Sequence, residues 1–185
     1  MTAMLDIPQL LREYDRARAY TDQLWTDLSV EEVHWRPHEN SSAIGWHLGH
    51  QAHVAHFMIR NLTAAEPSPD PELDPVMDSA NPEPGRGTLP DLARLATFRH
   101  DVADSVHARI GAISDGRVGA PRQLAIVART LLIAVINHEY QHDQWISEVR
   151  SGDLGQALPD RPASDLLTEL DGYLVVGDHL MPARD

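Results

Sequence analysis

Apolar residues recur at steps of three and four along the first part of the chain, the spacing that places them on one face of an α-helix. The first run predicts a helix over about residues 6–28. The next follows a polar stretch in which Asn40, Ser41 or Ser42 can cap a helix, and it predicts a second helix that runs to about residue 65. Each helix has an apolar face that needs a partner.

The segment of residues 66–90 interrupts this pattern. It holds seven of the thirteen prolines, which favour loops over helices and strands. A connection of this length is uncommon inside a compact domain unless it serves a function. We therefore interpret it as a long loop that covers part of a site or contributes to a dimer contact, with a disordered crossover as the alternative.

Two further apolar stripes follow the loop. Thr88 can cap a third helix with Pro90 in its first turn, and a fourth helix is expected over about residues 121–150. No alternating strand pattern persists, so the four apolar faces must cover one another. The sequence predicts an all-α four-helix bundle in a single domain, with a core over about residues 6–150.

Residues 151–185 form a C-terminal extension to the predicted bundle. Its first part reads SGDLGQALPDRPAS. A short helix is expected from about residue 164. The sequence pattern assigns no role to this extension.

The composition narrows the classes of function. The formal net charge is −13 and lysine is absent, which argues against a nucleic-acid partner. Cysteine is also absent, so a metal would be bound by histidine or carboxylate side chains. The start of the chain does not resemble a secretory signal, and the longest apolar stretch is too short to span a membrane. We expect a cytoplasmic protein with no membrane partner.

The sequence HEYQH, which begins at His138, contains the His-Glu-x-x-His pattern that places two ligands on one helix in many zinc peptidases. Both histidines fall in the middle of the predicted apolar face of the fourth helix, where a shared metal ion would offset the cost of burying them. Two core histidines bonded to carbonyls or carboxylates are the alternative. Glu139, a catalytic candidate as the base of a peptidase, lies about 100° round the helix and is less well aimed inward.

A third ligand is expected from the second helix, where WHLGHQAHVAHF supplies four histidines three residues apart. This spacing turns backwards by about 60° per step, so the four cannot all face one metal ion. His47 lies inside the predicted apolar arc and His50 lies at its edge. His53 and His56 lie outside it, and we interpret them as surface residues. Periodicity alone slightly prefers His47 as the ligand.

The chain resembles the DinB superfamily, the DinB/YfiT-like metalloenzymes, through SSAIGWHLGH at the start of the second helix and HEYQH in the fourth. The resemblance covers most of the chain. It implies a four-helix bundle in which one histidine of helix two and a His-x-x-x-His pair of a later helix hold a metal ion. In the family pattern the ligand follows a leucine and a small residue, as His50 follows Leu48 and Gly49. The implied metal ligands are therefore His50, His138 and His142.

Three neutral imidazoles would leave coordination positions open, so a bound ion could activate water or polarise a substrate or thiol. All-nitrogen ligation suits zinc, nickel or iron(II). The resemblance implies a metal-dependent enzyme that transfers a low-molecular-weight thiol or catalyses a thiol-assisted isomerisation of a small molecule. The alternatives are a hydrolase, acting as a zinc peptidase or through metal-bound water, and a protein that binds a metal or ligand without turnover. We also expect a homodimer.

Arg99 lies within the predicted apolar stripe of the third helix and is the second catalytic candidate. It is interpreted either as an anion-binding group beside the metal, or as a snorkelling or acid-paired arginine of the bundle. Glu139, Asn61 and Gln141 are candidates for orienting the histidine rings.

Overall fold

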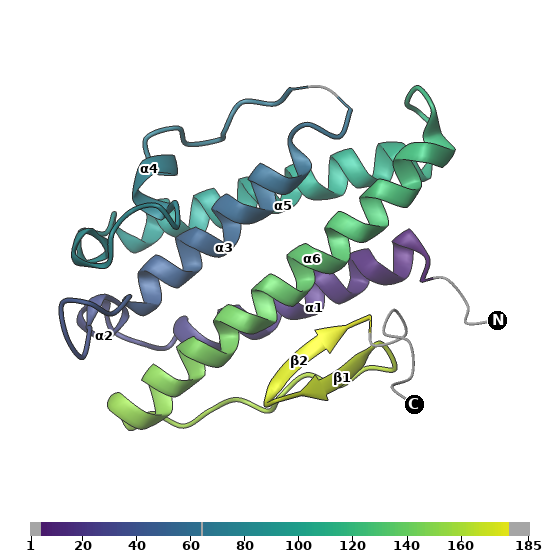
Figure 1. Cartoon of the computed structure of the whole chain (residues 1–185). Helices are drawn as coiled ribbons and strands as arrows, with labels where there is room; N and C mark the ends of the chain where they lie inside the picture. The colour runs from purple at the N-terminus through teal and green to yellow at the C-terminus, as the bar shows by residue number, and fades with distance from the viewer. Residues whose placement is uncertain (1–4, 64, 178–185) are drawn as a thin grey trace.

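The computed structural model describes residues 5–63 and 65–177. Four long helices run along one another, namely α1 (Ile7–Trp25), α3 (Ile44–Ile59), α5 (Leu92–Ser114) and α6 (Pro121–Glu148) (Figure 1). Helix α1 packs against α6, α3 packs against α5, and α3 and α6 also contact each other. The predicted all-α four-helix bundle is confirmed.

The core lies between the apolar faces of these helices. The predicted stripes of the first and third helices are buried, as shown by Leu10 and Tyr14 on α1 and by Val102 and Ile110 on α5. Burial of such side chains stabilises the fold by about 1.5–3 kcal/mol each before the entropic cost of ordering the chain. The periodicity of α1 and α5 therefore reflects real packing.

The second helix begins and ends differently from the prediction. Its N-cap is Ala43, which makes no side-chain capping bond, and the helix ends at Ile59 instead of near residue 65. Ser41 does not cap it because its hydroxyl donates to the carbonyl oxygen of His38 in the preceding turn, at 2.7 Å. None of the three predicted residues caps the helix, because a polar residue near a helix start can bond within the preceding turn instead of to the helix.

The third helix also begins later than predicted. Its N-cap is Asp91, whose carboxylate accepts a hydrogen bond from the amide of Arg94 at 2.8 Å. Thr88 therefore does not cap the helix, and Pro90 lies before the cap. Both threonine and aspartate are good N-cap residues, and the periodicity of the helix does not show which of Thr88 and Asp91 is the cap.

The loops carry short helices. The link after α1 contains α2 (Val30–His34), and the proline-rich segment contains α4 (Asp74–Met77) and the 3₁₀-helix η1 (Glu83–Gly87). Figure 1 shows α4 beside α3, so the proline-rich segment covers one side of the bundle.

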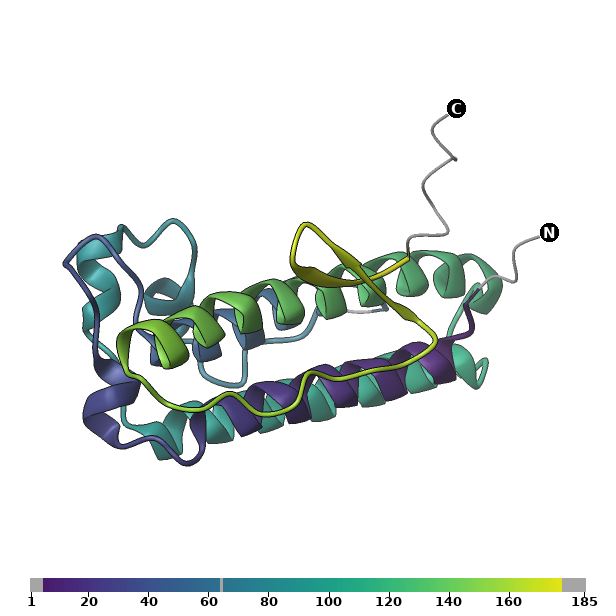
Figure 2. The same cartoon turned by 90° about the horizontal axis from the view of Figure 1, so that it is seen from below.

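The C-terminal extension does not form the helix expected from about residue 164. A π-helical turn, η2 (Val149–Asp153), ends α6, and the chain then runs back along the bundle (Figure 2). It ends in an antiparallel hairpin of β1 (Leu167–Leu170) and β2 (Tyr173–Val176). Residues 178–185 of the predicted extension lie outside the described residues.

The turn of this hairpin explains the wrong prediction. Asp171 and Gly172 both have positive φ, 51° and 90°, as the tight primed turn of a two-residue hairpin requires. An Asp-Gly pair between apolar runs is a strong hairpin signal, and it outweighs the weak helical spacing of the leucines.

Side-chain bonds hold the hairpin on α6. The amide group of Asn137 donates to the carbonyl oxygen of Val176 at 3.0 Å and accepts from its backbone N–H at 2.7 Å. The extension is thus part of the packed structure. None of the helices in the described residues is both long enough and apolar enough to cross a membrane.

Candidate metal centre

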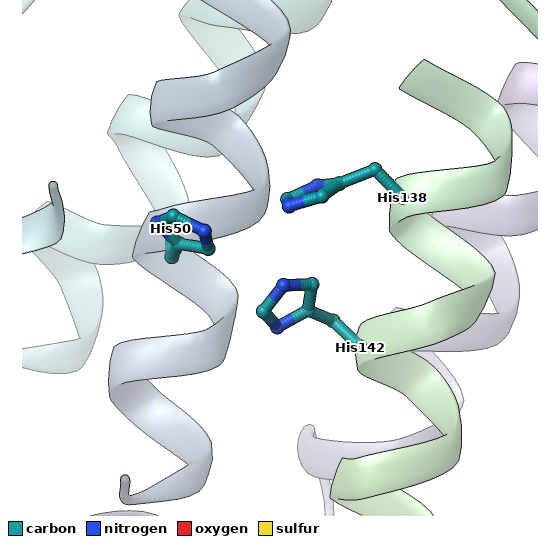
Figure 3. Close-up of side chains that lie close together, drawn as sticks. All are labelled: His50, His138 and His142. Atoms are coloured by element: carbon teal, nitrogen blue, oxygen red, sulfur yellow. The ribbon is translucent and has the colours of Figure 1, made fainter. Parts of the chain in front are cut away.

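Three histidines from two helices meet in the groove between α3 and α6. His50 projects from α3, and His138 and His142 project from successive turns of α6 (Figure 3). One ring nitrogen of each lies within 4.8 Å of those of the other two. The structure therefore brings together the three residues predicted as metal ligands, and the group is able to hold a metal ion.

The three rings are nearly equidistant. Their centroids are 4.4 Å apart for His138 and His142, 4.9 Å for His50 and His142, and 5.1 Å for His50 and His138. The i, i+4 spacing on α6 supplies one edge of this triangle, and the packing of α3 against α6 supplies the third corner. A single ion between the rings could contact all three.

A backbone carbonyl determines the tautomer of His50. Its Nδ1 lies 2.6 Å from the carbonyl oxygen of Met77. A carbonyl only accepts hydrogen bonds, so Nδ1 carries the proton and the lone pair is on Nε2. A partner of this kind is typical of metal-binding histidines.

His47 contacts His142 instead of completing the triangle. The Nδ1 atoms of the two rings are 2.8 Å apart, so one of them donates to the other. When His142 is the donor, its Nε2 carries the lone pair and is available for a metal ion. The periodicity of the second helix favoured His47 as the ligand. In the structure His47 instead contacts the ligand candidate His142, in a position suited to orienting its ring.

Burial keeps the histidines neutral. It lowers the pKa of His138 to about 4 and that of His47 to about 3, and the repulsion that either ring would meet from a protonated His50 lowers both further. Burial also lowers the pKa of His50 and of His142. Neutral imidazole is the form that binds metal ions, so the site needs no deprotonation at neutral pH.

Gly49, the residue before His50, is small because α4 packs closely against it. A Cβ atom on Gly49 would lie 2.2 Å from the sulfur of Met77. The absence of a side chain therefore lets α4 approach α3 closely enough for the Met77 carbonyl to reach His50. The family pattern of a small residue before the ligand corresponds here to a close helix contact.

The proline-rich segment forms a wall of the site. The indole N–H of Trp46 donates to the carbonyl oxygen of Val76 at 3.0 Å, and the Trp46 ring stacks on His50 with centroids 4.5 Å apart. This segment also covers the far side of α3. His56 is consequently buried and His53 lies against Asp74, so the prediction that both are surface histidines is wrong.

The histidines open into a cavity of about 630 Å³. Polar and aromatic side chains from α3, η1, α6 and η2 surround it, together with the loop that precedes α3. Those with a bearing on function are Ser42, Trp46, His47, Glu83, Arg86, Gln141, Trp145, Glu148 and Asp153. The volume is within the usual range for a small-molecule site.

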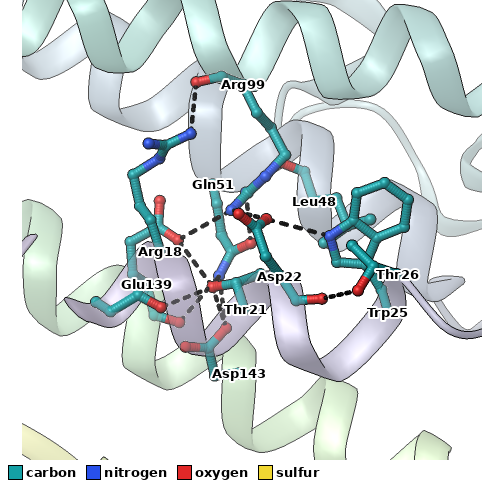
Figure 4. Close-up of polar contacts among 11 residues, drawn as sticks. Arg18, Thr21, Asp22, Trp25, Thr26, Leu48, Gln51, Arg99, Glu139 and Asp143 are labelled. Carbon is teal, nitrogen blue, oxygen red and sulfur yellow. Dashed lines mark hydrogen bonds and ion pairs between the residues drawn. The ribbon is translucent and has the colours of Figure 1, made fainter. Parts of the chain in front are cut away.

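The two catalytic candidates from the sequence, Glu139 and Arg99, lie elsewhere. Both are buried inside the bundle, in a polar cluster that also contains Thr21, Gln51 and Asp143 (Figure 4). The guanidinium of Arg99 is 3.9 Å from the Glu139 carboxylate and donates to Gln51 Oε1 at 3.0 Å. Neither candidate lines the cavity.

The polar cluster connects the helices behind the histidines. The Thr21 hydroxyl lies 2.7 Å from Asp143 Oδ1, and the Gln51 amide donates to the same oxygen at 3.0 Å. Burial raises the pKa of the Glu139 carboxyl and raises that of the Asp143 carboxyl well above its ordinary value. The Gln51 amide also donates to the Glu139 carbonyl oxygen, so the cluster joins α3 to α6 next to His50 and His138.

The orientation of α6 predicted from the apolar stripe is wrong by about a quarter turn. Glu139 is 1% exposed and central, whereas His138 lies at the edge of the buried face and Val127, placed on the predicted stripe, is 47% exposed. The error arose because Glu139 was interpreted as a polar residue at the flank of the apolar stripe. Its partners on α1, α3 and α5 could not be read from the sequence of α6.

Of the residues expected to orient the rings, Gln141 lines the cavity and Asn61 is exposed. The sequence provided little signal for Trp46, which stacks on a candidate ligand. It provided none for Met77, which acts through its backbone.

Comparison with known families is consistent with this geometry. The sequence pattern of the DinB superfamily matches residues 13–146, most of the chain and all of its histidine cluster. The chain belongs to the DinB superfamily. No curated protein matches it in sequence. The match ends before η2, so the hairpin lies outside the part shared with the DinB superfamily.

Proposed function

We propose that this DinB-superfamily protein binds one divalent metal ion through His50, His138 and His142 and acts as a metal-dependent enzyme on a low-molecular-weight thiol. The observation that carries the proposal is the meeting of three neutral ring nitrogens beside an open cavity. A metal ion with free positions would supply Lewis acidity and lower the pKa of a thiol or water. Zinc, nickel and iron(II) suit nitrogen ligands of this kind.

The protein's own residues support the proposed chemistry by positioning. His47 and the Met77 carbonyl orient the rings of His142 and His50, as outer hydrogen-bond partners commonly do. Trp46 and Trp145 line the cavity next to the three histidines and reduce the access of water to them. A thiol held there would face fixed nitrogens and aromatic faces, so its sulfur would be desolvated for attack on a second molecule.

A second cavity supports a reaction with two substrates. It measures about 470 Å³ and lies between α6 and the hairpin, with a mainly apolar lining that includes Met58, Tyr173 and Leu174. His138 and Gln141 line both cavities. A polar thiol in one cavity and a less polar acceptor in the other could therefore both approach His138, as a thiol transfer or thiol-assisted isomerisation requires.

A hydrolase is the second candidate. The carboxylate-bearing residues Glu148 and Asp153 line the larger cavity and could accept a proton from an attacking water molecule. A peptidase that uses Glu139 as its base is not proposed, because that carboxylate points into the bundle.

The test begins with elemental analysis of the purified protein. The metal-loaded protein is then incubated with an electrophile and with glutathione, mycothiol or bacillithiol, and thiol loss is followed. About one ion per chain and metal-dependent consumption of one of the thiols are expected. Thiol-independent hydrolysis of ester substrates would favour the hydrolase, and a protein that takes up no metal would contradict both. The expected homodimer stays a prediction, to be measured by sedimentation velocity.

A further inference from the structure

Arg86 is the one arginine among the described residues that line the cavity. It belongs to η1, and its guanidinium lies over the ring of Trp46, 4.1 Å from the centroid. Trp46 in turn stacks on His50 at 4.5 Å with an interplanar angle of 12°. The guanidinium, the indole and the imidazole thus form one stack that leads from the cavity wall to the candidate metal ligands.

The guanidinium of Arg86 is held by three hydrogen bonds and keeps further N–H groups for a ligand. Its Nε donates to the carbonyl oxygen of Asn81 at 2.9 Å, one terminal nitrogen donates to the Ser79 carbonyl at 3.0 Å, and the other donates to the Ser42 hydroxyl oxygen at 3.3 Å. A guanidinium has five N–H groups, so two are left, one on each terminal nitrogen. These two can bind both oxygens of a carboxylate.

The charge of Arg86 is uncompensated in the described part of the chain. No carboxylate there forms an ion pair with it, although Glu83, Glu148 and Asp153 line the same cavity. These acidic residues repel an anion, so an anion in the cavity needs the Arg86 guanidinium as its partner.

We propose that Arg86 binds a carboxylate of the thiol substrate and thereby sets which thiols the enzyme accepts. The inference rests on the proposed thiol chemistry. The stacking distances place the guanidinium two ring spacings from His50. The carboxylate must therefore be separated from the sulfur by a linker of several bonds. Arg86 is a specificity-determining residue in this proposal and contacts no metal.

The experiment uses the full chain loaded with cobalt(II), whose absorption reports thiolate binding. Mercaptoacetate, mercaptopropionate and mercaptohexanoate are each compared with the mercaptoalkanol of the same chain length. We expect one carboxylate to bind roughly tenfold more tightly than its matched alcohol, as a charged hydrogen-bonded pair allows. In Arg86→Gln the carboxylates should lose this advantage over their matched alcohols. Arg86→Lys keeps the positive charge but not the paired N–H donors of the guanidinium, so it should retain part of the preference.

Arg94→Gln is the matched control. Arg94 ties the same proline-rich segment to α5 through Asp70 and Glu72, yet it does not line the cavity. Loosening the segment alone should leave the carboxylate preference intact in this variant.

The outcomes separate the two proposals. If no thiol perturbs the cobalt spectrum, the proposed function fails. If carboxylates and alcohols bind equally at every chain length, or if Arg86→Gln weakens both equally, thiol binding stands and the assignment of Arg86 is overturned.

Discussion

Two neighbouring sides of α6 carry similar polar side chains with opposite surroundings. On the side toward α3, His138 and His142 have ring nitrogens that meet at one point beside a cavity. On the inner side, Glu139 and Asp143 are enclosed by Thr21 and side chains of other helices. A rotation of about 100° separates adjacent residues of one helix. The residue types in HEYQH therefore do not reveal which side of α6 faces a binding site and which side faces the core.

The difference between the two sides lies in access and free bonding capacity. The histidines are neutral, have nitrogens with no partner among residues 5–63 and 65–177, and face space for a ligand. The carboxylates face core residues and an arginine, and they connect helices. We expect the two sides to separate metal binding from stability, and the following changes test that separation.

The largest effect is expected for the loss of a histidine of the triangle. His50→Ala, His138→Ala and His142→Ala should each reduce metal affinity by more than about 100-fold, beyond the range of a lost orienting partner, because two nitrogens cannot replace three. Elemental analysis and metal titration measure this loss. His100→Ala, on the exposed side of α5, is the control. Full metal retention in His50→Ala would contradict the ligand set.

On the inner side, we expect a loss of stability without a loss of metal. Glu139→Ala leaves the buried guanidinium of Arg99 without its nearest buried carboxylate, which should cost about 3 kcal/mol of unfolding free energy and lower the Tm by roughly 6–12 °C. Thermal unfolding and metal stoichiometry are measured on the same preparation. Glu139→Gln preserves the shape and should lose less. Release of the metal by a stably folded Glu139→Gln would break the distinction between the two sides.

His47→Ala tests the boundary between the two sides. Loss of the hydrogen bond to His142 removes an orienting partner, so metal affinity should fall by roughly 10- to 100-fold with the stoichiometry unchanged. Metal titration distinguishes this from ligand loss. If His47→Ala abolishes binding while His50→Ala retains it, His47 is the ligand from α3.

The smallest effect is expected for pH. Free imidazoles have a pKa of about 6.5, so three free ligands would lose metal steeply below that value. Here burial lowers the pKa of His138 to about 4 and lowers that of His50 and His142 as well, so the ligands stay neutral as the pH falls below 6.5. Affinity should change by less than about tenfold between pH 7 and pH 5 and fall only as the pH approaches 4. Titrations across this range would show a steep loss near pH 6 if the rings were in fact solvated.

The sequence by itself determined the helical class and the elements of the site. The period of the apolar positions depends only on local helix geometry, so it located α1 and α5 and their buried faces. The i, i+4 spacing of His138 and His142 likewise required no knowledge of other helices. His50 came from the likeness of its surroundings to the DinB superfamily, since periodicity favoured His47.

Only the tertiary structure decided which way the polar residues face. The burial of Glu139 and Asp143 depends on Thr21, Gln51 and Arg99, which come from three other helices. The Met77 carbonyl reaches His50 because Gly49 lets α4 approach, and the Asp171-Gly172 turn places an apolar hairpin beside His138. A polar side chain can be buried wherever partners satisfy it, and those partners are distant in the chain. Local periodicity contains no information about them.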